Sequence, residues 1–352
     1  MTDATMRAIL LTDHGDFDKL VYREDVPRPE PESHQVLLRI GACGLNNTDV
    51  NTRTAWYSKS DDAADAAWGG SSIQFPLIQG ADAVGTVVAV GDDADADLLD
   101  RRVMIDVWIR DPDDPLNMDK CRYFGSEVDG GYAEYAVVDY RNVYPVESEL
   151  SDSELATFAT SYVTAENMLD RANVSDGDIV LIPGASGGVG SALIQLANRR
   201  GATTVAMASE DKHANVQSVG PNALLPRSPA DLAAALQAAI GRESVEVVAD
   251  VVGGPLFPAF LDVLVRGGRY TCAGAIAGPI VDLDLRTMYL KDLTFTGATV
   301  VPPGTFGRLV KYIEDGEIRP LLAETYPLQD FVEAQKAFIA KQHVGNIVVT
   351  MS

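Results

Sequence analysis

The sequence predicts an α/β protein of two domains, one built from β-strands and one around a doubly wound parallel sheet. The chain has 352 residues, which at about 150 residues per domain suffices for two hydrophobic cores. Before Ser151, short strand-like stretches are separated by Pro, Gly and Asp clusters. From Ser151 onward, strand-like and helical stretches alternate, which is typical of βαβ units.

The predicted β domain consists of short hydrophobic stretches joined by polar turns. Strands are expected at residues 6–12, 34–44, 83–91, 101–109 and 130–138. Two stretches of small and acidic residues, 60–72 and 92–100, are predicted to be solvated loops.

The predicted parallel-sheet domain begins with a helix over residues 151–172, for which Ser151 or Ser153 is a suitable N-cap. Strands are then expected at 178–184, 203–209, 245–253, 269–275 and 293–299, and helices at 189–201, 231–241 and 255–268. After residues 302–304 the pattern predicts a helix, an extended segment, a second helix and a final strand.

Composition excludes several classes of partner. Fifty-one acidic residues against 28 basic ones give a net charge of −23, which argues against binding to nucleic acid or to an anionic membrane. Cys43, Cys121 and Cys272 are too far apart in sequence for a disulfide framework or a Cys-rich zinc site. No signal peptide or apolar run of about 18 residues is visible. We therefore expect a soluble cytoplasmic protein.

The strongest local motif is DIVLIPGASGGVGSALIQLA at residues 178–197, in which a buried strand leads through a glycine loop into a helix. Such a loop lets backbone N–H groups approach a pyrophosphate at the helix N-terminus. The motif predicts dinucleotide binding, with loop contacts from Ala185, Ser186, Gly187, Gly188 and Val189.

The same residues contain the G-x-S-x-G pattern of a hydrolase nucleophile, and Asp250 and His343 follow Ser186 in the order of a catalytic triad. A nucleophile elbow needs earlier strands of the same sheet. The residues before Ser151 instead read as a separate β domain, so dinucleotide binding is the better-supported interpretation.

The residues at the end of the second predicted strand of the parallel sheet indicate which nicotinamide cofactor the protein binds. An acid at its end would bind the ribose 2′-hydroxyl of NAD, but residues 203–209 end without one. Ser209 and Lys212 offer a hydroxyl and a cation suited to a 2′-phosphate, although Glu210 and Asp211 lie nearby. The sequence therefore favours NADPH.

Several motifs along the chain resemble those of one protein family and occur in the same order. They are ACGLNNTDVNTR (42–53), FPLIQGADAVGTVVAVG (75–91), DGGYAEYAVV (129–138), YVTAENML (162–169), GASGGVG (184–190), DVVGG (250–254), GGRYTCAGAIAG (267–278) and HVGNIVV (343–349). The chain resembles the medium-chain dehydrogenase/reductase superfamily, and within it the zinc-free quinone oxidoreductase and enoyl reductase branch.

The resemblance implies a GroES-like catalytic domain made of residues 1–151 and 302–352 around a Rossmann domain at 152–301. It also implies a homodimer or homotetramer. Further contacts to NADPH are implied for Thr164, Val252, Gly274, Ala275 and Asn346, the last of which stands where relatives often have a lysine.

The resemblance also implies that no metal is bound. Zinc-dependent members carry a Cys and a His where this chain has Asn46 and Ala81, and Asp82 follows where a Glu is usual. Neither an amide nor a methyl group makes a tight zinc site. The four-Cys structural zinc lobe is missing too, since Cys121 stands alone there, and Cys43 is expected in the core.

Without a metal, the substrate must already be electrophilic, such as a quinone, an enone or an aldehyde. Relatives of the enoyl reductase type place a Tyr eight residues after the Asp of the first motif, and Asp49 plus eight is Tyr57. A protonated phenol can donate to the substrate oxygen, and Asn46 can orient it. Alternatively, Tyr57 only lines the pocket and Asn46 makes a structural hydrogen bond. Trp108 is expected in the core or in the wall of the pocket.

We therefore predict a zinc-independent, NADPH-dependent oxidoreductase that reduces quinones or activated C=C bonds. The acidic stretch after Tyr57 would repel the phosphates of an acyl-CoA. The alternatives are an enoyl-thioester reductase, an alcohol dehydrogenase-like enzyme and a non-catalytic NADPH-binding protein.

Overall fold

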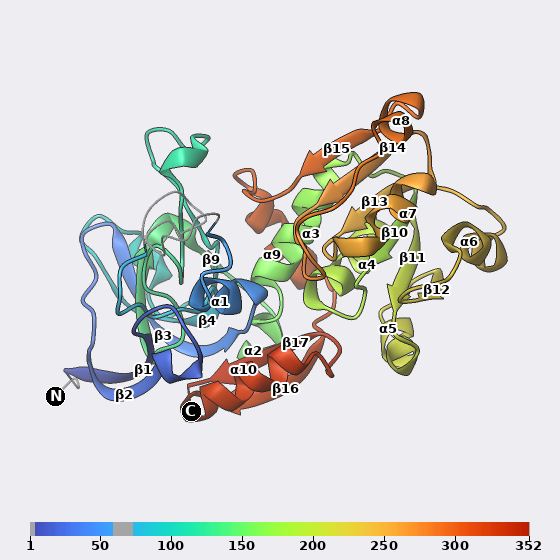
Figure 1. Cartoon of the computed structure of the whole chain (residues 1–352). Helices are drawn as coiled ribbons and strands as arrows, with labels where there is room; N and C mark the ends of the chain where they lie inside the picture. The colour runs from blue at the N-terminus through green and yellow to red at the C-terminus, as the bar shows by residue number, and fades with distance from the viewer. Residues whose placement is uncertain (1–3, 59–72, 352) are drawn as a thin grey trace. The chain divides into compact units, whose positions relative to one another are not determined.

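A computed structural model of the chain describes residues 4–58 and 73–351 (Figure 1). The acidic stretch 60–72 therefore lies outside the described residues. The chain divides into two compact units, which we call the first unit (Met1–Thr160 and Phe306–Ser352) and the second unit (Ser161–Thr305). Strands dominate the first and alternate with helices in the second, which confirms the predicted α/β class.

The first unit is built on a seven-stranded sheet in the order β16-β17-β3-β4-β5-β9, with β8 also paired to β3. Its strands are β3 (Gln35–Gly44), β4 (Asp82–Val90), β5 (Arg102–Ile105), β8 (Tyr135–Asp139), β9 (Val143–Pro145), β16 (Leu322–Pro327) and β17 (Asn346–Thr350). Because β17 pairs antiparallel with β3, residues near both chain ends share one sheet.

Smaller elements surround this sheet. Two hairpins are formed by β1 (Thr5–Leu11) with β2 (Leu20–Pro27) and by β6 (Trp108–Ile109) with β7 (Arg122–Tyr123). The helices are α1 (Asn47–Arg53), α2 (Asp152–Leu155), α9 (Thr305–Glu314) and α10 (Phe331–Ala340). Strand β2 was not expected from the sequence, because its partly exposed residues lack a clean alternation of polar and apolar side chains.

The predicted helix over 151–172 is two helices in the structure. Ser151 caps α2, accepting from the Glu154 backbone N–H, while the Glu154 carboxylate accepts from the Ser151 N–H. The chain then turns, and α3 (Ala159–Arg171) begins. The cap was predicted correctly, but the break after α2 was not.

The second unit holds a six-stranded parallel sheet in the order β12-β11-β10-β13-β14-β15, with α6 packed on β12 at one end (Figure 1). The strands are β10 (Ile179–Pro183), β11 (Thr203–Ala208), β12 (Ala223–Pro226), β13 (Val245–Asp250), β14 (Leu264–Cys272) and β15 (Thr294–Gly297). Besides α3, the helices are α4 (Gly188–Arg199), α5 (His213–Gln217), α6 (Leu232–Ile240), α7 (Phe257–Asp262) and α8 (Leu285–Leu290). This is the strand order of a Rossmann fold, as expected.

Several details of the second unit differ from the sequence prediction, including the short helices α5 and α8, which were not expected. Strand β12 is short and lies between β11 and α6, where no strand was expected. The predicted helix over 255–268 ends at Asp262, because Leu264 already pairs with Val245 of β13. Pairing within the sheet therefore overrides the helical pattern of the sequence there.

Candidate active site and cofactor site

Most of the predicted cofactor residues gather at one edge of the second unit's sheet. Strands β10, β11, β13 and β14 run parallel, so the segments that follow them open at the same edge. These segments contain Ala185, Ser186, Gly187, Gly188 and Val189 after β10, Ser209 and Lys212 after β11, Val252 after β13, and Gly274 and Ala275 after β14. Thr164 lies on α3, and Asn346 begins β17 in the first unit, so neither belongs to these segments.

The loops at this edge touch one another. A Cβ added to Gly184 would lie 2.9 Å from Cγ2 of Val252, and the φ of +70° at Gly184 favours glycine there. The Ala277 N–H donates to the Val252 carbonyl at 2.8 Å. The thiol of Cys272, whose pKa is raised by burial, donates to the Gly274 carbonyl at 3.2 Å. The loops after β10, β13 and β14 thus form one continuous surface.

The glycine loop fits a diphosphate. Helix α4 begins at Gly188, and its N-cap residue Gly187 supplies no side-chain cap, so the first-turn N–H groups have no intrahelical acceptor. A Cβ at Gly190 would lie 2.3 Å from the Gly184 carbonyl oxygen. Glycine at 190 therefore keeps the turn closed, and the helix N-terminus can receive the negative charge of a dinucleotide.

Asp250 has a structural role in this loop cluster. Its buried carboxylate accepts from the Val252 N–H at 2.7 Å, the Gly253 N–H at 3.1 Å and the Tyr270 hydroxyl at 2.6 Å. The non-glycine residues of positive φ in the described chain do not include Ser186, so Ser186 lacks the strained backbone of a nucleophile elbow. The structure gives the hydrolase alternative no support.

The segment after β11 carries charges of both signs. The Ser209 hydroxyl bonds to Asp211 and lowers the pKa of that carboxyl, and the Lys212 N–H donates to the Ser209 carbonyl at 2.9 Å. Glu210, Asp211 and Lys212 together give the segment a net charge of −1, from two acids and one base. The predicted 2′-phosphate ligands are therefore close together, but beside carboxylates.

In the first unit, Asn46 is the N-cap of α1 and is only 8% exposed. Its backbone N–H donates to Oδ2 of Asp49 at 2.7 Å. Its side-chain Nδ2 is buried and makes no hydrogen bond of good geometry to the described residues, although the amide is close enough to lower the pKa of Asp82. Oδ2 of Asp82 is likewise buried without a hydrogen bond of good geometry within the described parts of the chain, so the amide and this carboxylate lie close together at the start of α1.

Two buried carboxyl groups flank this amide. Burial raises the pKa of Asp49 to about 7, against the hydrogen bonds from the Asn46 N–H and from the Tyr132 hydroxyl at 2.7 Å. Burial likewise raises the pKa of Asp82 to about 6. Both carboxyl groups therefore take up protons at a pH near neutral, whereas exposed carboxyl groups do so only at lower pH.

Asp82 anchors a short chain of hydroxyl groups. Its Oδ1 accepts from the Thr160 N–H at 2.8 Å and from the Thr160 hydroxyl at 2.5 Å. The Thr160 Oγ1 is also 2.9 Å from the Tyr123 hydroxyl. Because Thr160 gives its only hydroxyl proton to Asp82, Tyr123 is the donor in that second bond.

Tyr57 lies beside the same helix turn. The chain folds back after α1, so that its hydroxyl donates to Thr48 Oγ1 at 3.3 Å and accepts from Asn51 Nδ2 at 3.3 Å. These distances are long for hydroxyl hydrogen bonds, so the group can turn to another acceptor at little cost. Because Thr48 is two residues from Asn46, the structure brings both predicted catalytic residues to the start of α1.

The position predicted to have lost a metal ligand is apolar. Ala81 is 1% exposed and adds only a methyl group beside Asp82. Across residues 4–58 and 73–351, no group of three or more His, Cys, Asp or Glu side chains is arranged to hold a metal ion.

Cys43 is fully buried and Trp108 is 5% exposed, so both are core residues.

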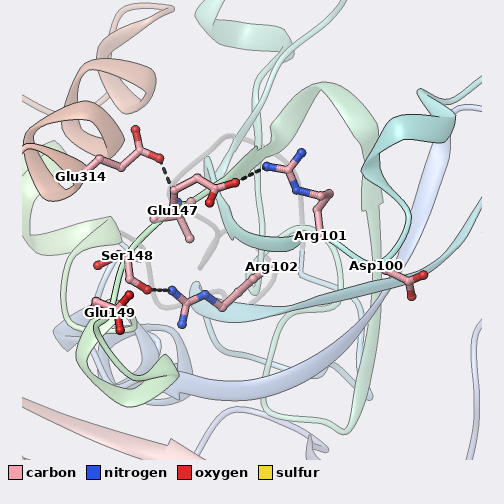
Figure 2. Close-up of a pocket in the computed structure, with 8 residues that line it drawn as sticks. Asp100, Arg101, Arg102, Glu147, Ser148, Glu149 and Glu314 are labelled. Carbon is pink, nitrogen blue, oxygen red and sulfur yellow. Dashed lines mark hydrogen bonds and ion pairs between the residues drawn. The ribbon is translucent and has the colours of Figure 1, made fainter.

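A pocket of about 560 Å³ in the first unit contains none of the predicted residues (Figure 2). It is lined by Asp100, Arg101, Arg102, Val146, Glu147, Ser148, Glu149 and Glu314. Arg101 pairs with Glu147 at 2.7 Å, Arg102 donates to the Ser148 carbonyl, and the Glu147 N–H donates to Glu314 at 2.9 Å. These groups satisfy one another, and we assign the pocket no chemistry.

Sequence reasoning missed Thr160 and Tyr123, which connect to Asp82. Thr160 is separated from Asp82 by 78 positions and Tyr123 by 41, so no local pattern joins them. The only signal was Asp82 itself, an acid within a hydrophobic strand sequence.

No helix among the described residues has the length and hydrophobicity that a membrane crossing requires.

Comparisons with known proteins agree with this architecture. The family profile for the alcohol dehydrogenase GroES-like domain matches residues 32–148, and that for zinc-binding dehydrogenase matches residues 188–315. A solved structure from Sinorhizobium meliloti 1021, described as a candidate alcohol dehydrogenase, is 48% identical with a TM-score of 0.92, covering 99% of this chain and 97% of that one.

Two further relatives cover nearly the whole chain. Human quinone oxidoreductase is 26% identical over 343 residues, covering 95% of this chain and 94% of its own. A 2-octenoyl-CoA carboxylase reductase solved with NADP and 2-octenoyl-CoA is 25% identical with a TM-score of 0.87, covering 99% of this chain and 88% of that one. The GroES-like and Rossmann folds expected from the sequence are thereby confirmed, and the chain belongs to the medium-chain dehydrogenase/reductase superfamily of oxidoreductases.

Proposed function

We propose that the protein is a zinc-independent, NADPH-dependent reductase of quinones or of C=C bonds conjugated to a carbonyl group. The observation that carries this proposal is the buried amide of Asn46 at the start of α1, close to the Asp82 carboxylate, with the Tyr57 hydroxyl bonded to Thr48 of the same helix turn. The Asn46 amide and the Tyr57 hydroxyl are neutral hydrogen-bond donors, and such donors stabilise a substrate oxygen that becomes negative during the reaction.

Bound NADPH would supply a hydride to the electrophilic carbon of the substrate. For an enone, negative charge then develops on the carbonyl oxygen, and the Asn46 amide would donate to that oxygen. Tyr57 would turn its hydroxyl from Thr48 toward the same oxygen and donate a hydrogen bond to it, and a proton delivered to the α carbon, from Tyr57 or from water, would then complete the reduction. Reduction of a quinone depends less on Tyr57 and Asn46, because the reduced quinone oxygens take protons from water.

The proposed ligands for NADPH are the loops at the carboxyl edge of the second unit's sheet. The first-turn N–H groups of α4 would bind the diphosphate, with Ala185, Ser186 and Val189 around it. Val252, Gly274 and Ala275 would contact the remainder of the cofactor, with Thr164 and Asn346 as further contacts. Ser209 and Lys212 would bind the 2′-phosphate, and the relative solved with NADP supports this cofactor.

Two enzyme alternatives remain. An enoyl-thioester reductase is supported by the relative solved with 2-octenoyl-CoA, and an alcohol dehydrogenase by the description of the Sinorhizobium structure. Alcohol oxidation of the zinc type would require a metal that Asn46 and Ala81 do not hold. The acidic stretch after Tyr57 disfavours a CoA ester, because it would repel the CoA phosphates.

We further propose that the chain is a cytoplasmic homodimer formed through the second unit. Strand β15 is the last strand of its sheet, and the segment before it exposes large apolar side chains, including Ile280 at 90%, Leu285 at 64% and Tyr289 at 62%. A second copy would cover them. Light scattering should give a dimer mass, and Leu285→Asp with Tyr289→Asp should shift it toward the monomer.

Steady-state assays test the function directly. Small quinones, enones, aldehydes, a primary alcohol and an enoyl-CoA should be offered with NADPH and with NADH. The proposal expects turnover with quinones or enones and NADPH, and none with the alcohol. Turnover of the enoyl-CoA alone would favour the thioester alternative, and absence of any turnover would favour a non-catalytic NADPH-binding protein.

A further inference from the structure

We infer that Tyr123 delivers the proton that completes the reduction of an enone, and that Thr160 and Asp82 supply this proton to Tyr123. The inference rests on the function proposed above, in which the enone takes up a hydride and then a proton at its α carbon. Neither Tyr123 nor Thr160 lies within the motifs that suggested that function, and only the structure joins them to Asp82. We call these three side chains the relay.

The relay is a continuous series of hydrogen bonds between three distant segments. Asp82 begins β4, Thr160 lies in the first turn of α3, and Tyr123 ends β7. Oδ1 of Asp82 is 2.5 Å from Oγ1 of Thr160, which is 2.9 Å from the Tyr123 hydroxyl oxygen. Both distances are those of O–H···O hydrogen bonds, so a proton can pass along the relay without a large movement of any side chain.

Every oxygen of the relay can either donate or accept a hydrogen bond. With Asp82 ionised, Thr160 donates to the carboxylate and Tyr123 donates to Thr160, so all protons point toward Asp82. With Asp82 protonated, the carboxyl donates to Thr160 and Thr160 donates to Tyr123, which directs the Tyr123 proton outward. Burial raises the pKa of Asp82 to about 6, so a fraction of the molecules has this second arrangement near neutral pH.

The outer end of the relay lies near the proposed donors to the substrate oxygen. Burial raises the pKa of Tyr123 well above its usual value, and the charges of Asp82 and of the nearby Tyr57 raise it further, so Tyr123 keeps its proton at neutral pH. Trp108 packs edge-on against the Tyr123 ring, with the ring centroids 5.1 Å apart, and so holds the phenol in place. One carbon separates the oxygen of an enolate from its α carbon. A substrate oxygen bound by Tyr57 and Asn46 therefore places the α carbon near a second hydroxyl.

The relay would supply one proton per turnover. Hydride addition to the β carbon leaves an enolate, whose electron pair forms the new C–H bond at the α carbon while the O–H bond of Tyr123 breaks. The Tyr123 phenolate then takes the proton of Thr160, and Thr160 takes the proton of the Asp82 carboxyl. The net change is one proton moved from Asp82 to the product, with no oxidation or reduction beyond the hydride transfer. After the product leaves, a proton from solvent returns to Asp82 through Tyr123.

Steady-state kinetics with one enone and one quinone test the inference on variants of the full chain. Thr160→Val replaces the hydroxyl by a methyl group, Thr160→Ser restores a hydroxyl, and Tyr123→Phe removes the outer phenol. Thr157→Val is the matched control, since Thr157 is a buried threonine of the same segment whose hydroxyl donates to the Glu154 carbonyl at 2.7 Å. It lies outside the relay.

Thr160→Val and Tyr123→Phe should each lower kcat for the enone by about 10², with KM changed by less than about twofold. The double variant should be no slower than the slower single variant, because both changes interrupt the same relay. Thr160→Ser should recover most of the rate, and Thr157→Val should match the parent. Quinone turnover should stay at the parent's level in every variant, because the reduced quinone takes its protons from water.

Infrared spectra of the resting protein at pH 5, below the pKa of about 6 for Asp82, give a readout without turnover. The C=O stretch of the protonated Asp82 carboxyl can be identified by its absence in Asp82→Asn. It should shift in Thr160→Val and in Tyr123→Phe, because each change alters the hydrogen bonds along the relay. It should not shift in Thr157→Val.

Three results would overturn the inference while the proposed function stands. Unchanged enone turnover in Thr160→Val and Tyr123→Phe would assign the proton to Tyr57 or to water. Equal losses of enone and quinone turnover in these variants would give the relay a structural role only. A parent that reduces quinones but no enone would leave the relay without a reaction. A parent that reduces neither would refute the proposed function, and this inference with it.

Discussion

The two candidate sites of this protein are made of different atoms. The cofactor edge of the second unit is largely main chain, with the uncapped N-terminus of α4 and glycines that have no space for a Cβ. The site at the start of α1 in the first unit is side chain, with the Asn46 amide close to the Asp82 carboxylate and the Tyr57 hydroxyl bonded to Thr48. In the proposed function the first would bind the cofactor through backbone N–H groups and the helix dipole, and the second would act through side-chain hydrogen-bond donors.

This difference determines what a substitution does. Side-chain changes around the glycine loop matter mainly where a Cβ collides with the backbone, so their effect is on folding and cofactor affinity. At the α1 site, a single side-chain atom can be removed with little effect on packing, so we expect the effect on the proposed chemical step. The following predictions separate these two behaviours, from the largest expected effect to the smallest.

Tyr57→Phe removes the hydroxyl and keeps the ring. If Tyr57 donates to the substrate oxygen as charge develops, kcat for enones should fall by about 10²–10³ while KM changes much less. For quinones the loss should be milder. Steady-state kinetics with both substrate classes measures this.

The control for Tyr57→Phe is its thermal stability in the presence of NADPH, which should equal that of the parent. Equal enone turnover in the variant and the parent would mean that Tyr57 only lines the pocket. Asn46→Ala would then be the next variant to assay, because its amide is the other proposed donor.

Gly190→Ala should destabilise the second unit, because its Cβ would lie 2.3 Å from the Gly184 carbonyl oxygen. The expected loss in the free energy of unfolding is about 2–4 kcal/mol. Gly187→Ala is the matched control, since its Cβ meets nothing closer than 3.6 Å. Chemical denaturation without cofactor measures both, and equal stability of the two variants would contradict the close packing of the loop.

Asp49 should make stability depend on pH. Its folded-state pKa of about 7 lies above that of an exposed carboxyl, so the folded state binds more protons between about pH 4 and 7. This contribution is present at low pH and is lost as the pH rises through 7, by up to about 1.4 kcal/mol per pH unit. Denaturation of the parent and of Asp49→Asn at pH 5, 6, 7 and 8 measures it.

The difference in unfolding free energy between parent and Asp49→Asn should therefore change in favour of the variant as the pH rises from 5 to 7. A pH-independent difference would mean that Asp49 keeps the pKa of an exposed carboxyl. Asp82 contributes in the same direction through its pKa of about 6.

Metal removal should have no effect at all. With Asn46 and Ala81 in the predicted ligand positions, the purified protein should hold no stoichiometric zinc, and chelators should leave turnover unchanged. Elemental analysis and assays with a strong chelator measure this. One tightly bound zinc per chain would refute the proposed metal-free mechanism.

The fold could be predicted largely from local patterns. The alternation of strands and helices after Ser151 gave the parallel sheet, and the glycine loop gave the position of its first strand and of α4. Strand β12 was missed because it has only four residues, and the helix over 255–268 was drawn too long because strand pairing with β13 is not visible locally.

The candidate site could be predicted only in part. The glycine loop is contiguous in sequence, so its residues were identified together, and the structure brings the loops after β11, β13 and β14 to the same edge. The bond network from Asp82 through Thr160 to Tyr123 joins three distant segments. This network leaves no trace in sequence spacing.

Cys272 offers a built-in reporter for the cofactor edge. Cys43 and Cys121 are buried, whereas Cys272 is partly exposed at the end of β14 and bonded to the Gly274 carbonyl. A thiol-specific dye should therefore label the native protein first at Cys272, and slowly, because burial raises the pKa of that thiol. The labelling rate then measures occupancy of the neighbouring loop in the natural sequence, without any engineered cysteine.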